Sequence, residues 1–284
     1  MTLHHARGTL ELDRCLVMGI VNRTPDSFFD GGRMDLGASV DYAQQLVDEG
    51  ADILDIGAVK AGPGEDVSTD EEAERLLPLV KVLAETGVPL SIETSRPRIA
   101  QQVLDAGAAI INDVRGLADP GLADVCAAEG AGLILMHNGG QIRGRPRAPR
   151  YDDIVRTVID EWHRLAAIAN DHGVSTERIV VDAGLDFGKN TFHSLELVRR
   201  LDEQVAEPWP VLVAPSRKDV VGETLGIPLE ERLEGTLALV ALAVTAGAAI
   251  VRVHDVEAAV RTVRMVEAVM GTRKPAAPVR GLWD

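Results

Sequence analysis

The chain has 284 residues, which suits one α/β barrel or two smaller domains, and a hydrophobic content of 46% can fill one large core. A formal net charge of −15 argues against nucleic acid and against an anionic membrane surface as partners. The two cysteines form no metal-binding or redox pair, no apolar run approaches a membrane span, and the N-terminus lacks a signal region. We therefore expect a soluble, cytoplasmic protein with one domain over 1–274 and a loose tail over 275–284.

Short runs of Val, Ile and Leu follow one another along the chain and predict buried parallel strands. An alternating segment, GTLELDRCLVMGI, comes first and predicts a short N-terminal hairpin. The runs are, in chain order, LVMGIVN, ILDIG, PLSIET, AIINDV, LILMHN, IVVDAG, VLVAPSRK and IVRVHDV. Their number favours a TIM (β/α)8 barrel over a doubly wound open sheet, which would show the same local pattern.

Amphipathic segments between the runs predict the helices that cover such a barrel. They span 35–49, 69–86, 96–106, 120–129, 151–173, 194–205, 232–246 and 256–270. Several end in Gly just before the next run, as in DAGAAII and TAGAAIVRV, because Gly adopts the positive φ that ends a helix. The segment GTLALVALAVTAGA is apolar on nearly every side. We therefore expect its helix to be covered all round, and we favour a homodimer interface there over packing within one barrel.

Polar residues stand at the C-terminal ends of the predicted strands, where barrels build their active sites. They are Asn22, Asp55, Glu93, Asn112, His137, Asp182, Lys218, Arg252 and His254. Arg252 and His254 are two residues apart in a strand, so they face the same side and predict an anion site. Asn22 ends the first strand, where a buried carboxamide needs a ligand, a metal or an Asx turn to satisfy it.

A cation and two carboxylates suggest what else this site can bind. Lys218 supplies a point charge for an acceptor oxygen or, if desolvated, a nucleophile. Glu93 and Asp182, together with Asn112, can read the donor edge of a guanidine-like heterocycle such as a pterin or guanine. The alternative is that the carboxylates bind a divalent metal. The first strand lacks the His-x-His pair that a zinc hydrolase would need.

Taken in order, these motifs resemble the dihydropteroate synthase family from about Leu16 to Gly271. MGIVNRTPDSFFDGG is similar to that family's first-loop signature, and IINDV, LILMH, DAGLDFGK, APSRK and IVRVHDV match later motifs. The resemblance implies a barrel that binds 6-hydroxymethyl-7,8-dihydropterin pyrophosphate with Mg²⁺. It also implies a reaction in which the amine of 4-aminobenzoate attacks the methylene and pyrophosphate leaves.

The resemblance further implies a role for each matching residue. The pterin would be held by Glu93, Asn112, Asp182, Lys218 and Arg252, and the pyrophosphate with its Mg²⁺ by Asn22, Arg252 and His254. The aminobenzoate would lie beside Phe28, Asp30, Phe187 and Ser216, with Lys60 as a replacement anion clamp. Lys218, Arg252 and His254 are the implied catalytic residues, and the pair Arg252 and His254 would stabilise the leaving group electrostatically.

Five departures from the family pattern lie on the substrate-facing loops and the pterin floor. Arg23 replaces a small residue, the loop 57–64 loses Glu, Ser, Thr and Arg, and Glu93 replaces an Asp. The motif that begins at Asp182 has Ala183 for a Pro and Asp186 for a Gly, and 138–140 departs as well. Small displacements of recognition groups cost affinity and rate. We therefore predict a divergent paralogue that keeps pyrophosphate-side binding, has weakened pterin and aminobenzoate binding, and has weak or no synthase activity.

Three alternatives stay open at this point. An active synthase remains consistent with loops that reorganise around substrate. A pterin-dependent methyl transferase would use the same pocket with methyltetrahydrofolate, although the pair Arg252 and His254 counts against it. A regulatory or scaffold protein would keep the barrel and lose turnover, because fold alone does not choose among functions.

Overall fold

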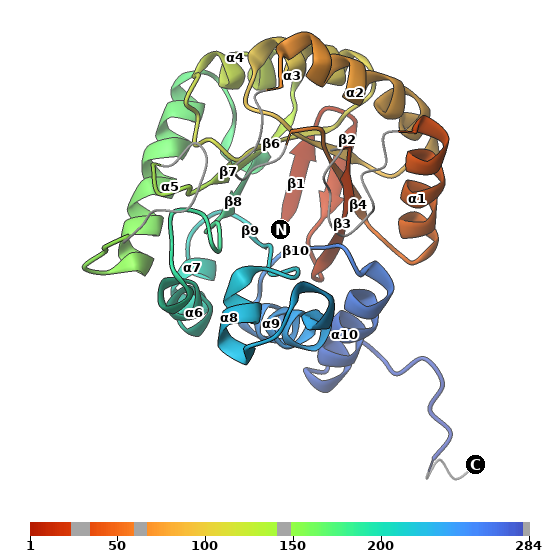
Figure 1. Cartoon of the computed structure of the whole chain (residues 1–284), viewed down its shortest axis with the longest axis vertical. Helices are drawn as coiled ribbons and strands as arrows, with labels where there is room; N and C mark the ends of the chain where they lie inside the picture. Colours follow the sequence, from red (N-terminus) through yellow and green to blue (C-terminus); the bar gives the residue numbers. More distant parts are fainter. Residues whose placement is uncertain (24–34, 60–66, 141–148, 281–284) are drawn as a thin grey trace.

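The computed structural model describes residues 1–23, 35–59, 67–140 and 149–280, and Figure 1 shows helices arranged around a central barrel. The barrel is closed, with strand order β10-β3-β4-β5-β6-β7-β8-β9, and neighbouring strands are parallel. The strands are β3 (Leu16–Asn22), β4 (Ile53–Gly57), β5 (Leu90–Glu93), β6 (Ile110–Asp113), β7 (Gly132–Met136), β8 (Ile179–Asp182), β9 (Val211–Val213) and β10 (Ile250–Val253). The predicted TIM barrel is confirmed.

The helices follow the strands in alternation, as the sequence pattern predicts. They are α1 (Leu36–Asp48), α2 (Thr69–Leu83), α3 (Pro97–Asp105), α4 (Gly121–Glu129), α5 (Ile154–Asp171), α6 (Thr191–Arg199), α7 (Leu201–Val205), α8 (Asp219–Leu225), α9 (Leu233–Ala246) and α10 (Val256–Val269). Gly130 and Gly247 end α4 and α9 with φ of 64° and 96°, which confirms the helix–Gly–strand joints. Among the described residues, no helix is long and apolar enough to cross a membrane.

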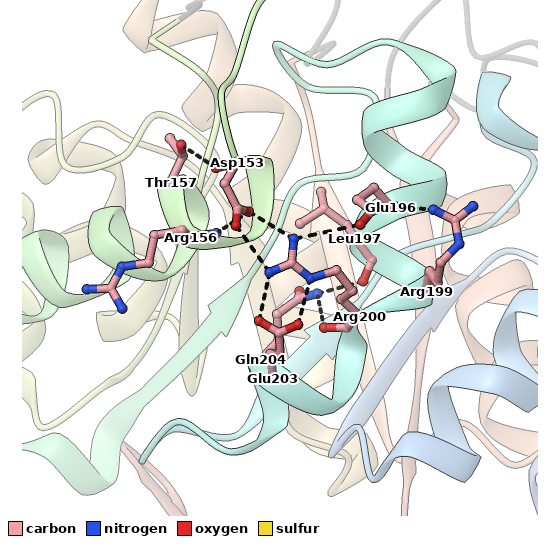
Figure 2. A network of polar contacts seen from close by, with 9 residues as sticks. All are labelled: Asp153, Arg156, Thr157, Glu196, Leu197, Arg199, Arg200, Glu203 and Gln204. Carbon is pink, nitrogen blue, oxygen red and sulfur yellow. Dashed lines mark hydrogen bonds and ion pairs between the residues drawn. The ribbon is translucent and has the colours of Figure 1, made fainter.

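The segment predicted as one helix over 194–205 forms two helices, α6 and α7, that meet at Arg200. The backbone of Arg200 leaves the helical region, with φ −109° and ψ 37°. Its guanidinium bonds Asp153, the N-cap of α5, and also Glu203 on α7, as Figure 2 shows. The break therefore lets one side chain join three helices. The sequence pattern also missed α8, a short helix that follows β9.

The N-terminal hairpin closes the floor of the barrel, at the end opposite the candidate site. Strands β1 (Thr2–His5) and β2 (Gly8–Glu11) pair antiparallel, which confirms the predicted hairpin. Leu3 is fully buried in an interior cluster with Met18 and Ile53, residues of the strands themselves. Burying one such side chain contributes about 2 kcal/mol, so the hairpin is part of the core rather than an appendage.

Helix α9 is buried on one side only within a single chain. Val240 and Val244 face the barrel, whereas Leu242 is 55% exposed. Helix α10 packs beside α9 and exposes Met265 and Val269 by 64% and 74%. One chain therefore leaves an apolar surface uncovered over α9 and α10, which lie side by side in Figure 1.

Candidate functional site

The strand ends bring five of the predicted side chains to one end of the barrel. Asp55, Glu93, Asn112, Asp182 and Arg252 come from β4, β5, β6, β8 and β10. The parallel register pairs Gly57 with Glu93 and Glu93 with Asn112, which places these ends at one level. Residues separated by up to 197 positions in the sequence thus share one mouth.

Arg252 lies at the centre of a charged cluster. Its Nε donates to Asp55 Oδ2 at 2.6 Å, and its Nη2 donates to Glu93 Oε2 at 3.1 Å. Asp55 is fully buried and also accepts from Ser91 Oγ at 2.5 Å and from Asn112 Nδ2 at 3.2 Å. Burial opposes the charge of Arg252, but the two carboxylates outweigh it and raise its pKa. One guanidinium is therefore held between two acidic side chains.

Asp182 and Lys218 lie on the other side of the mouth. Asp182 is 6% exposed, and its Oδ1 accepts from the backbone N–H of Gly184 at 2.7 Å. Lys218 donates from Nζ to the carbonyl of Leu185 at 2.7 Å and lies 4.9 Å above the ring of Phe187. Burial raises the pKa of Asp182 and lowers that of Lys218, and each group partly counters the shift of the other.

Sequence reasoning missed Lys189, which organises the loops beside Asp182. Lys189 is 4% exposed, and its Nζ donates to the carbonyls of His137, Gly184 and Phe187 at 2.8–3.1 Å. Burial lowers the pKa of Lys189 to about 7, although Asp182 favours its charge. Lys189 ends the motif DAGLDFGK, but it lies beyond the strand, so a rule based on strand ends does not reach it.

Ser216 and His254, which follow β9 and β10 in the chain, form a pair. Ser216 Oγ lies 2.8 Å from His254 Nδ1 and accepts from the His254 backbone N–H at 3.1 Å. Burial, reinforced by Arg252, lowers the pKa of His254 to about 3. The imidazole is therefore neutral near pH 7 and acts as a hydrogen-bonding group rather than as a cation.

The first loop begins in an ordered way. Asn22 ends β3, and Arg23 follows it with 5% exposure, its N–H bonded to Gly57 O and its Nη1 to the carbonyl of Arg75 on α2. The guanidinium that departs from the family pattern is therefore anchored to a helix. Three predicted aminobenzoate residues, Phe28, Asp30 and Lys60, lie outside the described residues.

Asp186, another departure, has a local structural role. It adopts a φ of 69°, a left-handed conformation that Asp tolerates better than most residues. Its Oδ2 accepts from the N–H of Asp219 at 2.7 Å, at the start of α8, and its Oδ1 from Ser194 Oγ at 3.2 Å. Asp186 therefore adopts the left-handed backbone conformation that a Gly would adopt at this position, and its carboxylate also links α6 to α8.

The donor set offers little to a divalent metal by itself. Among the described residues, no group of three or more His, Cys, Asp or Glu side chains is arranged to hold a metal ion. Asn22, the predicted ligand, contributes one amide oxygen. Mg²⁺ prefers several oxygen ligands and is commonly held through substrate phosphates. Its retention here would therefore depend on oxygens brought by a bound diphosphate.

Comparisons with known proteins agree on the family. A family model described as pterin binding enzyme matches residues 18–254. The chain is 48% identical over 278 residues to a Mycobacterium leprae protein named inactive dihydropteroate synthase 2, covering 95% of this chain and 96% of the relative. It is 38% identical over 273 residues to the dihydropteroate synthase of Escherichia coli, with coverages of 95% and 97%. The crystal structure of the Yersinia pestis dihydropteroate synthase with a sulfonamide drug complex matches with a TM-score of 0.91 at 37% identity, covering 96% of this chain and 100% of that chain. The protein belongs to the dihydropteroate synthase family of pterin-binding enzymes.

Proposed function

We propose that this chain is a dihydropteroate synthase homologue that keeps a pocket for a pterin-like heterocycle and has weak or no synthase activity. The observation that carries the proposal is the pairing of Arg252 with both Asp55 and Glu93. A guanidinium already held by two carboxylates stabilises a leaving diphosphate less than an uncommitted one would. The names of relatives in Mycobacterium leprae and Mycobacterium bovis, inactive dihydropteroate synthase 2, support the same reading.

The heterocycle half of the site has complementary donors and acceptors. Asp182 is an acceptor for the N–H groups of a pterin, Lys218 is a donor to its ring acceptors, and Asn112 offers both kinds of group. Arg252 presents a planar guanidinium on which a flat ring can stack. These residues would bind and orient the ring, and the burial of Asn112 and Asp182 would exclude water from its edge.

The pyrophosphate side of the site is less favourable to its ligand than the heterocycle half. Asn22, Arg252 and His254 would hold pyrophosphate and Mg²⁺, yet His254 is neutral near pH 7 and Arg252 is already paired. When bound, Mg²⁺ would neutralise charge on the leaving group. On the aminobenzoate side, Phe187 lies under Lys218 and Ser216 is bonded to His254. The described residues therefore favour a weakened pyrophosphate side, which the hypothesis drawn from the sequence expected to be kept. Of the aminobenzoate side, Phe28, Asp30 and Lys60 lie outside the described residues.

We further propose a cytoplasmic homodimer whose interface covers the exposed apolar side chains of α9 and α10. Leu242, Met265 and Val269 supply that surface, and a second copy of the chain is the partner that would bury it symmetrically. Within each protomer, residues 1–274 would form one domain and 275–284 a tail. The tail leaves the barrel after α10, as Figure 1 shows up to residue 280.

The test is a synthase assay with the dihydropterin pyrophosphate, Mg²⁺ and 4-aminobenzoate. Dihydropteroate formation is followed by chromatography, with the Escherichia coli enzyme as the positive control. We expect turnover lower than that of the control by a factor of about a thousand or more, as for loss of a major electrostatic contribution. Turnover equal to that of the control would establish the alternative, an active synthase.

A further inference from the structure

Among the described residues, Arg252, Asp55, Glu93 and His254, which lie in the part of the mouth that would receive a diphosphate, together carry no net positive charge. Arg252 supplies the cation, and Asp55 and Glu93 supply two carboxylates within 3.1 Å of it. His254 adds no charge near pH 7 because burial keeps its pKa at about 3. An anion placed beside Arg252 would therefore meet both carboxylates at close range.

Glu93 is the adjustable member of this cluster. Asp55 is fully buried and fixed by Ser91 and Asn112 as well as by Arg252, so its position is determined from several sides. The side chain of Glu93 is 11% exposed and bonds Arg252 through the end of its longer stem. A carboxylate one methylene shorter would fall short of Nη2 by more than an ångström.

Charged groups from several elements face Glu93. They are Arg252 on β10, Asp55 on β4, Lys218 before α8 and Glu72 on α2. Burial raises the pKa of Glu93 to about 7, so its carboxylate is ionised at pH 8 and about half protonated near pH 7. Its ion pair with Arg252 is therefore complete under mildly alkaline conditions, where its effect on ligand choice is greatest.

The heterocycle half is not obstructed in the same way. Asp182 accepts one hydrogen bond from a backbone N–H, and Lys218 donates one of its three protons to a carbonyl. Both side chains therefore retain hydrogen-bonding capacity for a ring. The side of the mouth with Asp182 and Lys218 can therefore still bind a ring, whereas the side with Arg252 disfavours an anion.

We propose that this site selects a neutral pterin- or guanine-like heterocycle that lacks a diphosphate arm, and that Glu93 sets this preference by pairing with Arg252. The inference rests on the proposed function, since it requires that the site binds a heterocycle. It adds the ligand class and the residue that determines it. In this role the carboxylate of Glu93 takes the position beside Arg252 that a diphosphate group on the ligand would otherwise take.

Calorimetric titration at pH 8 tests the inference with two probes, 6-hydroxymethyl-7,8-dihydropterin and its diphosphate with Mg²⁺. We expect the wild-type chain to bind the bare heterocycle more tightly than the diphosphate by about tenfold or more. Glu93→Gln removes the charge and keeps the shape, so it should shift that ratio toward the diphosphate by about tenfold or more. Glu93→Asp, which shortens the reach, should shift it in the same direction and replaces Glu93→Gln if that variant does not fold.

Glu74→Gln is the matched control, because Glu74 is an exposed glutamate on α2 and is not among the charged groups that face Glu93. It should leave the ratio unchanged. A wild-type preference for the diphosphate, or a ratio that neither Glu93 variant alters, would overturn the inference while leaving the proposed function standing. Failure of a folded wild-type chain to bind either probe would reject the proposed function, and the inference with it.

Discussion

Burial decides which side chains at the barrel mouth carry charge. His254 and His137 are kept neutral because burial lowers the pKa of each to about 3. Glu93 and Lys189 have opposite charges in water, and burial moves the pKa of both to about 7. The electrostatic character of the site near neutrality therefore depends on desolvation as much as on residue type.

Glu93 should make the stability of the protein depend on pH. Its folded-state pKa of about 7 lies above the ordinary 4.5, so the folded chain binds a proton that the unfolded chain has released between these values. The contribution of Glu93 to the free energy of unfolding should therefore fall as pH rises from about 4.5 to 7, by about 3 kcal/mol at most. His137 and His254, whose pKa values burial lowers, contribute in the opposite direction, and they are common to the wild type and to Glu93→Gln. Denaturant unfolding of both proteins at pH 5 and pH 8 therefore isolates the contribution of Glu93: relative to the variant, the wild type should become less stable between the two pH values. Equal changes in the variant and the wild type would contradict it.

Lys189 should stabilise the loops that frame Asp182. Lys189→Met keeps the apolar stem and removes the ammonium, leaving three carbonyls without their donor. We expect a loss of about 2–4 kcal/mol in the free energy of unfolding and weaker binding of 6-hydroxymethyl-7,8-dihydropterin. Lys81→Met, at an exposed position on α2, removes a charge without these bonds and serves as control. Wild-type stability in the Lys189 variant would show that the three bonds contribute nothing.

The candidate site could be predicted from sequence where strand ends supply it. Asn112, Asp182 and Arg252 were found because alternation and chain direction fix which residues reach the mouth. The pairing of Arg252 with Asp55 and Glu93 could not be predicted, since it depends on side-chain reach across the barrel. Lys189 was not predicted because it lies beyond the strand end, and the carbonyls that its ammonium reaches come together only when the loops fold.

At the scale of elements, the predicted strands and most helices agree with the structure because hydrophobic periodicity is strong in both. The exceptions have local causes. The segment 194–205 breaks at Arg200, whose ion pairs with Asp153 and Glu203 lie across helix ends and leave no periodic signal. Helix α8 has 7 residues, too few for a full amphipathic repeat.

The loops after β7 and β8 should depend on Gly139. A Cβ there would lie 2.9 Å from Gly188 Cα and 2.7 Å from Tyr151 Oη, and the residue has a φ of 66°. Gly140 has a φ of 72° but open space around a Cβ, so Gly140→Ala measures the backbone cost alone. We expect Gly139→Ala to lower the free energy of unfolding by about 1–3 kcal/mol more than Gly140→Ala. Denaturant unfolding measures both variants, and equal losses of free energy of unfolding would contradict a clash of the new Cβ with Gly188 and Tyr151.

At the scale of the whole molecule, the exposed side chains of α9 and α10 bear on assembly. Leu242→Glu places a charge in the proposed interface, and we expect it to raise the dimer dissociation constant about a hundredfold or more. Light scattering after size-exclusion chromatography gives the mass directly. Val82→Glu, at a partly exposed position on α2 across the barrel, is the matched control and should leave the mass unchanged. A monomeric wild-type chain, or a dimer indifferent to Leu242→Glu, would contradict the proposed interface.

The closure of the barrel by β10 has a consequence for how the chain folds. β10 pairs with both β3 and β9, and Arg252 bonds Asp55 across 197 residues of sequence. These contacts form only after nearly the whole chain has left the ribosome, and pairings of such long sequence separation are slow. Until then β3 and β9 expose unpaired edges that invite association with other chains. Nascent or truncated chains that end before Ile250 should therefore aggregate readily and depend on chaperones during synthesis.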